Sequence, residues 1–87
     1  MAFEIFYHPD CLNKDIPKLD KTVLKRLRQS IETRLASDPE NFGKPLRYTK
    51  SGLWSLRVAD WRVIYKISGH QVWVLRIGHR REVYKFF

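Results

Sequence analysis

Most of the side chains that could bind phosphate lie in the second half of this 87-residue chain. Ten lysines and arginines lie between residue 44 and the C-terminus, where only Asp60 and Glu82 are acidic, whereas residues 1–43 carry seven side chains of each sign. A guanidinium stays charged at any working pH and can grip two phosphate oxygens at once. The formal net charge of +8 therefore belongs to one segment, and it indicates a surface that faces a polyanion, most simply nucleic acid.

The basic half contains three runs typical of β-strands, at residues 53–58, 61–67 and 72–77, joined by turns short enough for hairpins. Side chains alternate between the faces of a strand, so each run divides into two sets. One set has no charge: Trp54, Leu56, Val58, Trp61, Val63, Tyr65, Ile67, Trp73, Leu75 and Ile77. The other set contains four cations among its nine residues, which are Leu53, Ser55, Arg57, Arg62, Ile64, Lys66, Val72, Val74 and Arg76. The pattern predicts an antiparallel meander with an apolar face and a basic face.

Two interpretations of the basic face remain open. A half-exposed structural sheet would segregate its charges in the same way, because an unpaired buried charge is costly. A structural surface, however, usually mixes signs, and acids are missing from this set. The absence of neutralising acids favours a functional surface.

The first half predicts the helices that cover the apolar face. Residues 2–7 are typical of a strand, and Asp10 can cap a short helix over residues 10–15. Asp20 can cap a longer helix to residue 37, with Leu24, Leu27, Ile31 and Leu35 on one face. Residues 78–87 fit either a final strand or a short helix. The fold class predicted is α+β, in a single domain spanning residues 1–87.

Composition excludes several other classes of protein. Cys11 is the only cysteine, so no internal disulfide can form, which fits a reducing compartment and predicts a cytoplasmic protein. No apolar run is long enough to span a bilayer, so no membrane association is expected. Neither a metal-ligand cluster nor a phosphate-cradling glycine loop is visible, so no metal or cofactor is expected.

Four short motifs have the order and spacing of a known family. They are GKPL at residues 43–46, SGLW at 51–54, WRVIY at 61–65 and IGHRREVY at 77–84. Following one strand and two helices, they resemble the RelE/ParE superfamily of toxins from bacterial and archaeal toxin–antitoxin pairs, and most of all its RelE branch. The resemblance covers essentially the whole chain. It implies a RelE-like fold, in which a helical hairpin packs on one face of an antiparallel sheet formed by the N-terminal strand and the meander.

The RelE-like resemblance also implies an activity and partners. It implies a metal-independent endoribonuclease that cuts messenger RNA, usually in the A site of the 30S ribosomal subunit, and that a cognate acidic antitoxin silences. In this chemistry the ribose 2′-OH attacks the neighbouring phosphate, so the site needs a proton acceptor, cations for the pentavalent phosphate and a proton donor for the leaving 5′-oxygen.

Site residues follow from the matching positions. Arg62 matches the arginine of the second meander strand, Arg80 the arginine after the glycine near the end, and Tyr84 the tail tyrosine. Six further cations would position the RNA backbone: Lys44, Arg47, Lys50, Arg57, Arg76 and Arg81.

The chain departs from the RelE pattern at the proton acceptor. Leu53 and Ser55 stand where that branch has a pair of lysines, and Lys44 stands where some relatives have a glutamate. His79 is then the candidate acceptor, because an imidazole can take up and release protons near neutral pH. This role predicts that His79→Ala slows RNA cleavage far more than it weakens RNA binding.

Three functions remain compatible with the sequence. The first is the ribonuclease toxin. The second is a gyrase inhibitor of the ParE branch on the same scaffold, and the third is a catalytically inactive domain that binds RNA or only its partner. The joint presence of Arg62, Arg80, Tyr84 and His79 favours the ribonuclease, since an inhibitor surface does not need convergent cationic and proton-transfer groups.

Overall fold

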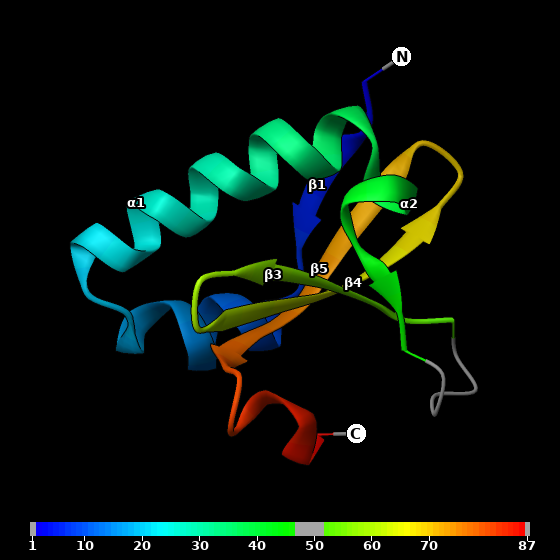
Figure 1. The fold of residues 1–87 in the computed structure, drawn as a ribbon. Coiled ribbons are helices and arrows are strands. Elements are labelled where there is room, and N and C mark those ends of the chain that lie inside the picture. Colours follow the sequence, from blue (N-terminus) through cyan, green and yellow to red (C-terminus); the bar gives the residue numbers. More distant parts are fainter. Residues whose placement is uncertain (1, 47–51, 87) are drawn as a thin grey trace.

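The computed structural model describes residues 2–46 and 52–86, which form a helical layer on a five-stranded sheet (Figure 1). The strands are β1 (Glu4–Tyr7), β2 (Lys44–Pro45), β3 (Trp54–Val58), β4 (Trp61–Ser68) and β5 (Gln71–His79). The α-helices are α1 (Lys21–Ser30) and α2 (Pro39–Phe42). Single helical turns of π or 3₁₀ type are η1 (Cys11–Asp15), η2 (Ile16–Lys18), η3 (Ile31–Leu35) and η4 (Val83–Phe86). The predicted α+β class is confirmed.

The sheet has the order β1-β5-β4-β3-β2 and is mixed. The predicted meander is confirmed, because β3, β4 and β5 pair antiparallel through two-residue turns. The expectation of an antiparallel sheet was wrong at one edge: β1 lies parallel to β5. A fifth strand, β2, pairs antiparallel with β3. Among the described residues, no helix is long and apolar enough to cross a membrane.

The helical hairpin begins with a different cap from the one expected. Asp10 caps nothing with its side chain; instead its backbone N–H donates to Nδ1 of His8 at 3.1 Å. The imidazole of His8 thus accepts a hydrogen bond from a backbone N–H that has no partner within the first turn of the helix. The second helix agrees with the prediction: Asp20 accepts from the backbone N–H of Val23 at 2.8 Å, and α1 continues through η3.

The apolar core lies between the helical hairpin and the sheet. Leu27, Ile31 and Leu35 of the long helix are buried there, as their spacing predicted. They pack with buried side chains of η1 and the strands, namely Cys11, Leu56, Val58, Val63, Tyr65, Val72, Val74 and Ile77. Burying aliphatic side chains of this size contributes about 1.5–3 kcal/mol each.

A β-bulge overturns part of the alternation predicted for the last strand. The register shifts between Ile64 and Tyr65, which pair with Arg76 and Val74, so Leu75 is an extra residue on β5. An extra residue reverses the alternation of the side chains before it. Val72 and Val74 therefore face the helices, and Trp73 lies on the other face, stacked on Phe6.

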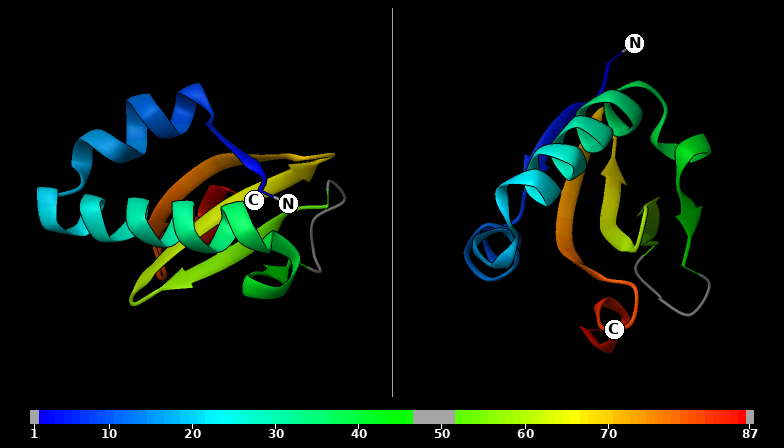
Figure 2. Two further views of the ribbon diagram at one scale, coloured as in Figure 1. Left: turned by 90° about the horizontal axis from the view of Figure 1, so that it is seen from above. Right: turned by 60° about the vertical axis from the view of Figure 1, so that its left-hand side comes forward.

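The C-terminal tail packs on the face of the sheet away from the helical hairpin (Figure 2). Val83 is buried there with Leu53 and Ile64 in a second apolar cluster. Gly78 permits this approach, because a Cβ on residue 78 would lie 3.1 Å from the Cβ of Val83. Of the two structures expected for the tail, the short helix is the one that forms, as η4.

Asp15 joins the helical hairpin to the end of β5. Its carboxylate, 8% exposed, accepts three hydrogen bonds: from Nε and Nη2 of Arg76 at 2.8 and 2.9 Å and from the backbone N–H of Ile77 at 2.9 Å.

The ion pair raises the pKa of Arg76, and burial next to Asp15 raises the pKa of Cys11 to about 12. The thiol of Cys11 is thus a neutral part of the core.

Removing the charge of Asp15 should destabilise the fold. Asp15→Asn keeps the shape but leaves Arg76 without its carboxylate, and breaking a buried ion pair costs about 3–5 kcal/mol. Asp10→Asn is the matched control, because the half-exposed Asp10 carboxylate has only long ion-pair distances, 3.9 Å to His8 and 3.8 Å to Lys14, and its loss should cost below about 1 kcal/mol. Urea unfolding measures both variants; equal losses would contradict the role of Asp15.

Gly43 should tolerate no side chain. A Cβ there would lie 1.8 Å from the hydroxyl oxygen of Tyr65, which is buried and donates to the carbonyl of Pro39 at 2.5 Å. Gly43→Ala should therefore cost about 3 kcal/mol through overpacking. Gly69→Ala is the control: a Cβ there meets nothing within 4 Å, so its cost is the backbone strain alone, about 1 kcal/mol. Thermal unfolding that ranks Gly69→Ala as the worse variant would contradict this account.

Candidate nucleic-acid interface

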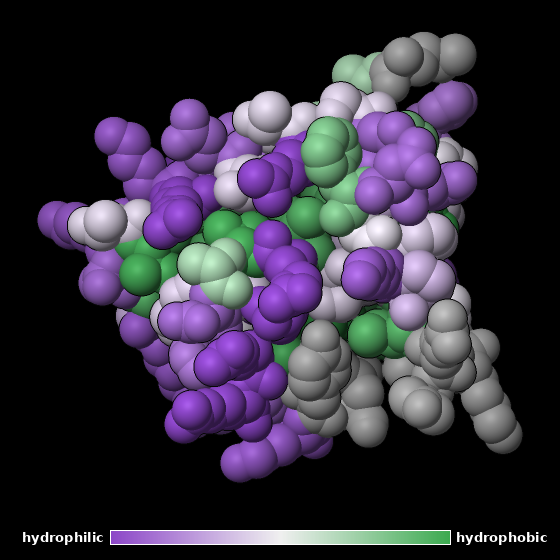
Figure 3. All heavy atoms as spheres, in the orientation of Figure 1, coloured by the Kyte–Doolittle hydropathy of each residue, from purple (hydrophilic) through white to green (hydrophobic). Residues whose placement is uncertain are grey.

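A cavity of about 700 Å³ lies on the face of the sheet away from the helical hairpin, between β2, the β3–β4 hairpin and the C-terminal tail. We call it the cationic pocket, and its lining residues are Phe42, Lys44, Leu46, Ser55, Arg57, Arg62, Arg80 and Arg81. In Figure 3, hydrophilic side chains gather over the β3–β4 hairpin and the start of the C-terminal tail. Among the described residues, those that line the pocket include no carboxylate and no imidazole.

Strand register brings two of the arginines together. Arg57 of β3 pairs directly with Arg62 of β4, which in turn pairs with Gly78 of β5. Directly paired residues project from the same face, so both guanidinium groups extend over the pocket. Like charges in this position are destabilising. An anion bound between them would remove that cost.

Arg62 is held in place by the turn that precedes it. Its side chain is largely buried, with 7% of the residue exposed, and Nη1 donates to the carbonyls of Ala59 and Trp61 at 3.0 and 2.9 Å. Ala59 reaches this geometry with a φ of 54°, in the left-handed region. The guanidinium is therefore fixed before any ligand binds, which lowers the entropic cost of binding.

The tail carries Arg80 and Arg81 to the same pocket. After Gly78 the chain turns back over the β3–β4 hairpin, where the backbone N–H of Arg80 donates to the carbonyl of Asp60 at 2.8 Å. The Arg80 side chain is 50% exposed, and its Nε lies 3.8 Å from the Asp60 carboxylate. An exposed pair at this distance is weak, so the guanidinium can turn toward an anion at little cost.

Five of the ten site residues predicted from the sequence line the cationic pocket: Lys44, Arg57, Arg62, Arg80 and Arg81. Arg62 and Arg80 share this cavity although the chain separates them by a whole hairpin. Arg47 and Lys50 lie outside the described residues. The backbone of Tyr84 lies in η4, and its side chain is outside the described part of the structure.

Arg76 does not join these cations. The bulge at Leu75 and the pairing of its guanidinium with Asp15 turn it over the edge of β5 toward η1. Arg76 therefore binds Asp15 within the fold and does not line the cationic pocket. The sequence missed this pairing because Asp15 lies sixty-one positions away in the chain.

His79 also lies apart from the cationic pocket. It pairs with Trp61 across β4 and β5, one position beyond the Arg62–Gly78 pair, so its ring projects from the helical face. There it contacts the indole of Trp61 edge-on, with ring centroids 5.7 Å apart. The expected combination of His79 with Arg62 and Arg80 in one pocket is thus not present, because strand alternation separates them.

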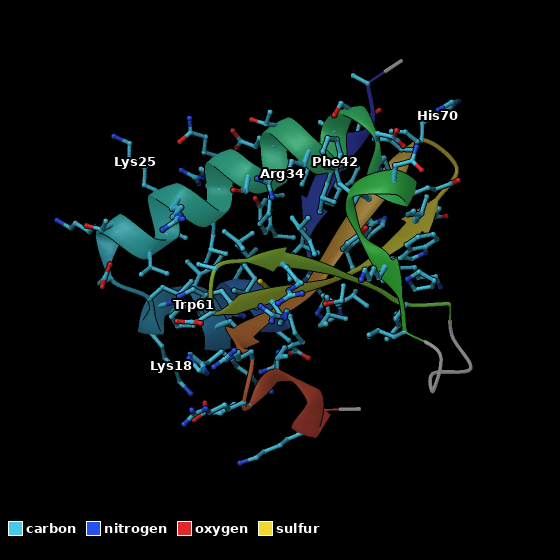
Figure 4. The ribbon with its side chains drawn as sticks, in the orientation of Figure 1. Lys18, Lys25, Arg34, Phe42, Trp61 and His70 are labelled. Carbon is cyan, nitrogen blue, oxygen red and sulfur yellow. The ribbon has the colours of Figure 1, made fainter. Side chains whose placement is uncertain are left out.

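Phe42 is a lining residue that sequence reasoning missed. It ends α2, is 51% exposed and stands at the rim of the cationic pocket (Figure 4). Its signal in the sequence is an aromatic residue immediately before Gly43 in a segment without apolar periodicity. Exposed rings of this kind can stack on nucleic-acid bases.

Among residues 2–46 and 52–86, no three histidine, cysteine or acidic side chains gather closely enough to hold a metal ion. The chemistry that the cationic pocket offers is electrostatic. Fixed guanidinium groups can bind the oxygens of a phosphodiester and stabilise the extra negative charge of a pentavalent phosphate.

Comparisons with known proteins agree with this geometry. A family model described as the ParE toxin of the type II toxin–antitoxin system parDE matches residues 6–84. The chain is 31% identical over 74 residues to Toxin RelG of Mycobacterium tuberculosis, covering 83% of this chain and 85% of that protein. It is also 31% identical over 74 residues to Toxin RelE of the same organism, covering 83% and 76%.

Solved structures show the same architecture. The toxin–antitoxin complex RelBE2 of Mycobacterium tuberculosis contains a chain that matches with a TM-score of 0.84 and 26% identity, covering 94% of this chain and 95% of that chain. A chain of the intact RelBE complex of E. coli matches with a TM-score of 0.72 and 21% identity, covering 90% and 96%. With a family model that spans most of the sequence and curated relatives above 30% identity, this chain belongs to the RelE/ParE superfamily of type II toxins.

Proposed function

We propose that this toxin is an endoribonuclease that cuts messenger RNA on the ribosome without a metal ion. One observation carries the proposal: five cations line a single cavity in which no described lining residue is acidic. Such a cavity is costly in the free protein, because its charges repel one another. A phosphodiester backbone would neutralise it.

The reaction needs little covalent chemistry from the protein. The ribose 2′-oxygen forms a bond to the adjacent phosphorus, the bond from phosphorus to the 5′-oxygen breaks, and the products are a 2′,3′-cyclic phosphate and a 5′-hydroxyl. One proton leaves the 2′-OH and one reaches the 5′-oxygen, so the sum is balanced without oxidant or water. The largest part of the activation barrier comes from the extra negative charge on the pentavalent phosphate. Guanidinium groups around the phosphate stabilise this charge.

Arg62 and Arg80 bind the reacting phosphate in this proposal. Arg62 is fixed by two backbone carbonyls and needs no rearrangement. Arg80 is half exposed and can close on the phosphate from the tail. Lys44, Arg57 and Arg81 hold the phosphates on either side, which sets the register of the strand.

Tyr84 is the proposed proton-transfer group. It follows Val83, whose side chain is buried against the sheet and anchors η4 beside the cationic pocket. A phenol can donate or accept a proton in a general acid–base step. His79 is not assigned this task, because its ring is on the helical face.

An acidic antitoxin is the proposed partner. The similar chains from Mycobacterium tuberculosis and E. coli were each solved in a toxin–antitoxin complex. An acidic segment placed over the cationic pocket would remove the same repulsion that RNA removes, and it would exclude RNA by competition. The toxin would then be active only when the antitoxin is lost.

Inhibition of DNA gyrase is the second candidate, because the family model that matches residues 6–84 is described as a ParE toxin. In that case the basic surface would bind the enzyme or its DNA, and no RNA would be cut. The cationic pocket favours the ribonuclease, since an inhibitor does not need a buried and fixed arginine such as Arg62.

Translating ribosomes incubated with the purified toxin should yield messages cut within codons at the A site, mapped by primer extension. A gyrase supercoiling assay run in parallel separates the candidates. Intact messages with blocked supercoiling would establish the gyrase inhibitor. Intact messages with normal supercoiling would leave only a domain that binds RNA or its antitoxin.

Arg80→Ala should lower kcat/KM for message cleavage about a hundredfold, the usual effect of removing one donor that stabilises transition-state charge. Stability should change little, because the ion pair with Asp60 is exposed and long. Lys25→Ala removes the same charge from an exposed position of α1, at the far end of the helix from Phe42 in Figure 4, and should leave cleavage unchanged. Equal losses in both variants would mean that only overall charge matters.

A further inference from the structure

A second cavity, of about 760 Å³, lies on the other side of the tail from the cationic pocket. We call it the ring pocket; its lining includes Asp15, Lys18, Trp61, Arg76, His79 and Glu82. One wall comes from the helical hairpin and the other from the ends of β4 and β5. Trp61 and Lys18 lie at this end of the molecule in Figure 4. The volume is within the range of small-molecule sites.

Strand alternation links the two pockets. Trp61 and Arg62 are neighbours in the chain, and the ring lines one pocket while the guanidinium lines the other. The same holds for His79 and Arg80. Each pair therefore spans the sheet with an aromatic ring on one side and an arginine on the other. A ligand that crosses the tail would meet arginines first and aromatic rings next.

The charges of the two pockets differ in kind. The cationic pocket has five cations, whereas the ring pocket has the cations Lys14, Lys18 and Arg76 beside the carboxylates of Asp15 and Glu82. Asp15 and Arg76 bind one another in the floor. The ring pocket is close to neutral and offers donors, acceptors and aromatic surface, which suits a nucleobase better than a phosphate.

His79 also presents a defined donor. Its Nδ1 accepts the backbone N–H of Arg81 at 3.3 Å, so in the neutral imidazole the proton is on Nε2. Nε2 can therefore donate to a carbonyl or ring nitrogen of a base. The edge-on contact with Trp61 holds the imidazole in this orientation.

We propose that the ring pocket binds one base of the same RNA strand whose phosphates lie in the cationic pocket, and that the base lies against Trp61 and His79 on the sheet side of the ring pocket. This inference rests on the proposed function, because it takes RNA as the ligand of the cationic pocket. It gives His79 a role in substrate binding in place of proton transfer. The RNA strand bends around the C-terminal tail of the protein. Its phosphates contact Arg62 on one face of the sheet, and its base contacts Trp61 on the other face.

The test uses short RNA oligomers with 2′-O-methyl groups, which cannot be cut, and a series in which one base at a time is removed. Binding to the full toxin is measured at fixed salt. At one position, loss of the base should weaken binding about tenfold, as expected for a single stacked base. That penalty should disappear in His79→Ala and in His79→Gln, which loses the ring but keeps a polar group. Circular dichroism checks that both variants are folded.

His70→Ala is the matched control. His70 is exposed in the turn between β4 and β5, at the opposite end of the molecule from Trp61 in Figure 4, and its removal should leave the penalty intact. A penalty that persists unchanged in both His79 variants, or no penalty at any position, would overturn the inference. Message cleavage is scored separately: cutting without a His79-dependent penalty rejects the ring pocket alone, whereas the penalty without cutting rejects the nuclease alone.

Discussion

The carboxylate of Asp15 is the contact on which the arrangement of the two pockets depends. It ties the first helical turns to Arg76 and to the backbone of Ile77, just before β5 gives way to the tail. Beyond Tyr7, no strand among the described residues lies beside this edge of β5, and Asp15 accepts the backbone N–H of Ile77 there in place of a neighbouring strand. The position from which Arg80 and Arg81 depart is thereby fixed relative to the helical layer.

Where strands pair without interruption, the sequence predicted the faces correctly. Alternation placed Leu56, Val63 and Tyr65 in the core and Arg57 and Arg62 on the opposite face, and the structure agrees. These predictions succeeded because a period of two is maintained in any regular strand. The helix capped by Asp20 succeeded for a similar reason, since capping and periodicity are both local.

The errors arose where distant residues decide the outcome. The extra residue at Leu75 moved Trp73 away from the core, and no local feature of that segment distinguishes it from a regular strand. Arg76 was expected on the RNA-binding surface because Asp15 is far away in the sequence. His79 was assigned to the site of Arg62 as the remaining proton acceptor, but its pairing with Trp61 in β4 turns its ring to the helical face. Composition correctly identified the second half of the chain as basic. Which of its cations converge on one pocket could be decided only from the register of the strands.

The two edge strands of the sheet affect whether copies of this protein aggregate at high concentration. At one border, β2 is only two residues long and contains Pro45, which lacks an amide hydrogen. At the other, β1 is four residues long and begins with the charged Glu4. Short borders with a proline or a charge are poor templates for pairing with a foreign backbone. A strand-rich chain with an apolar core is in this way protected against forming intermolecular sheets and aggregating.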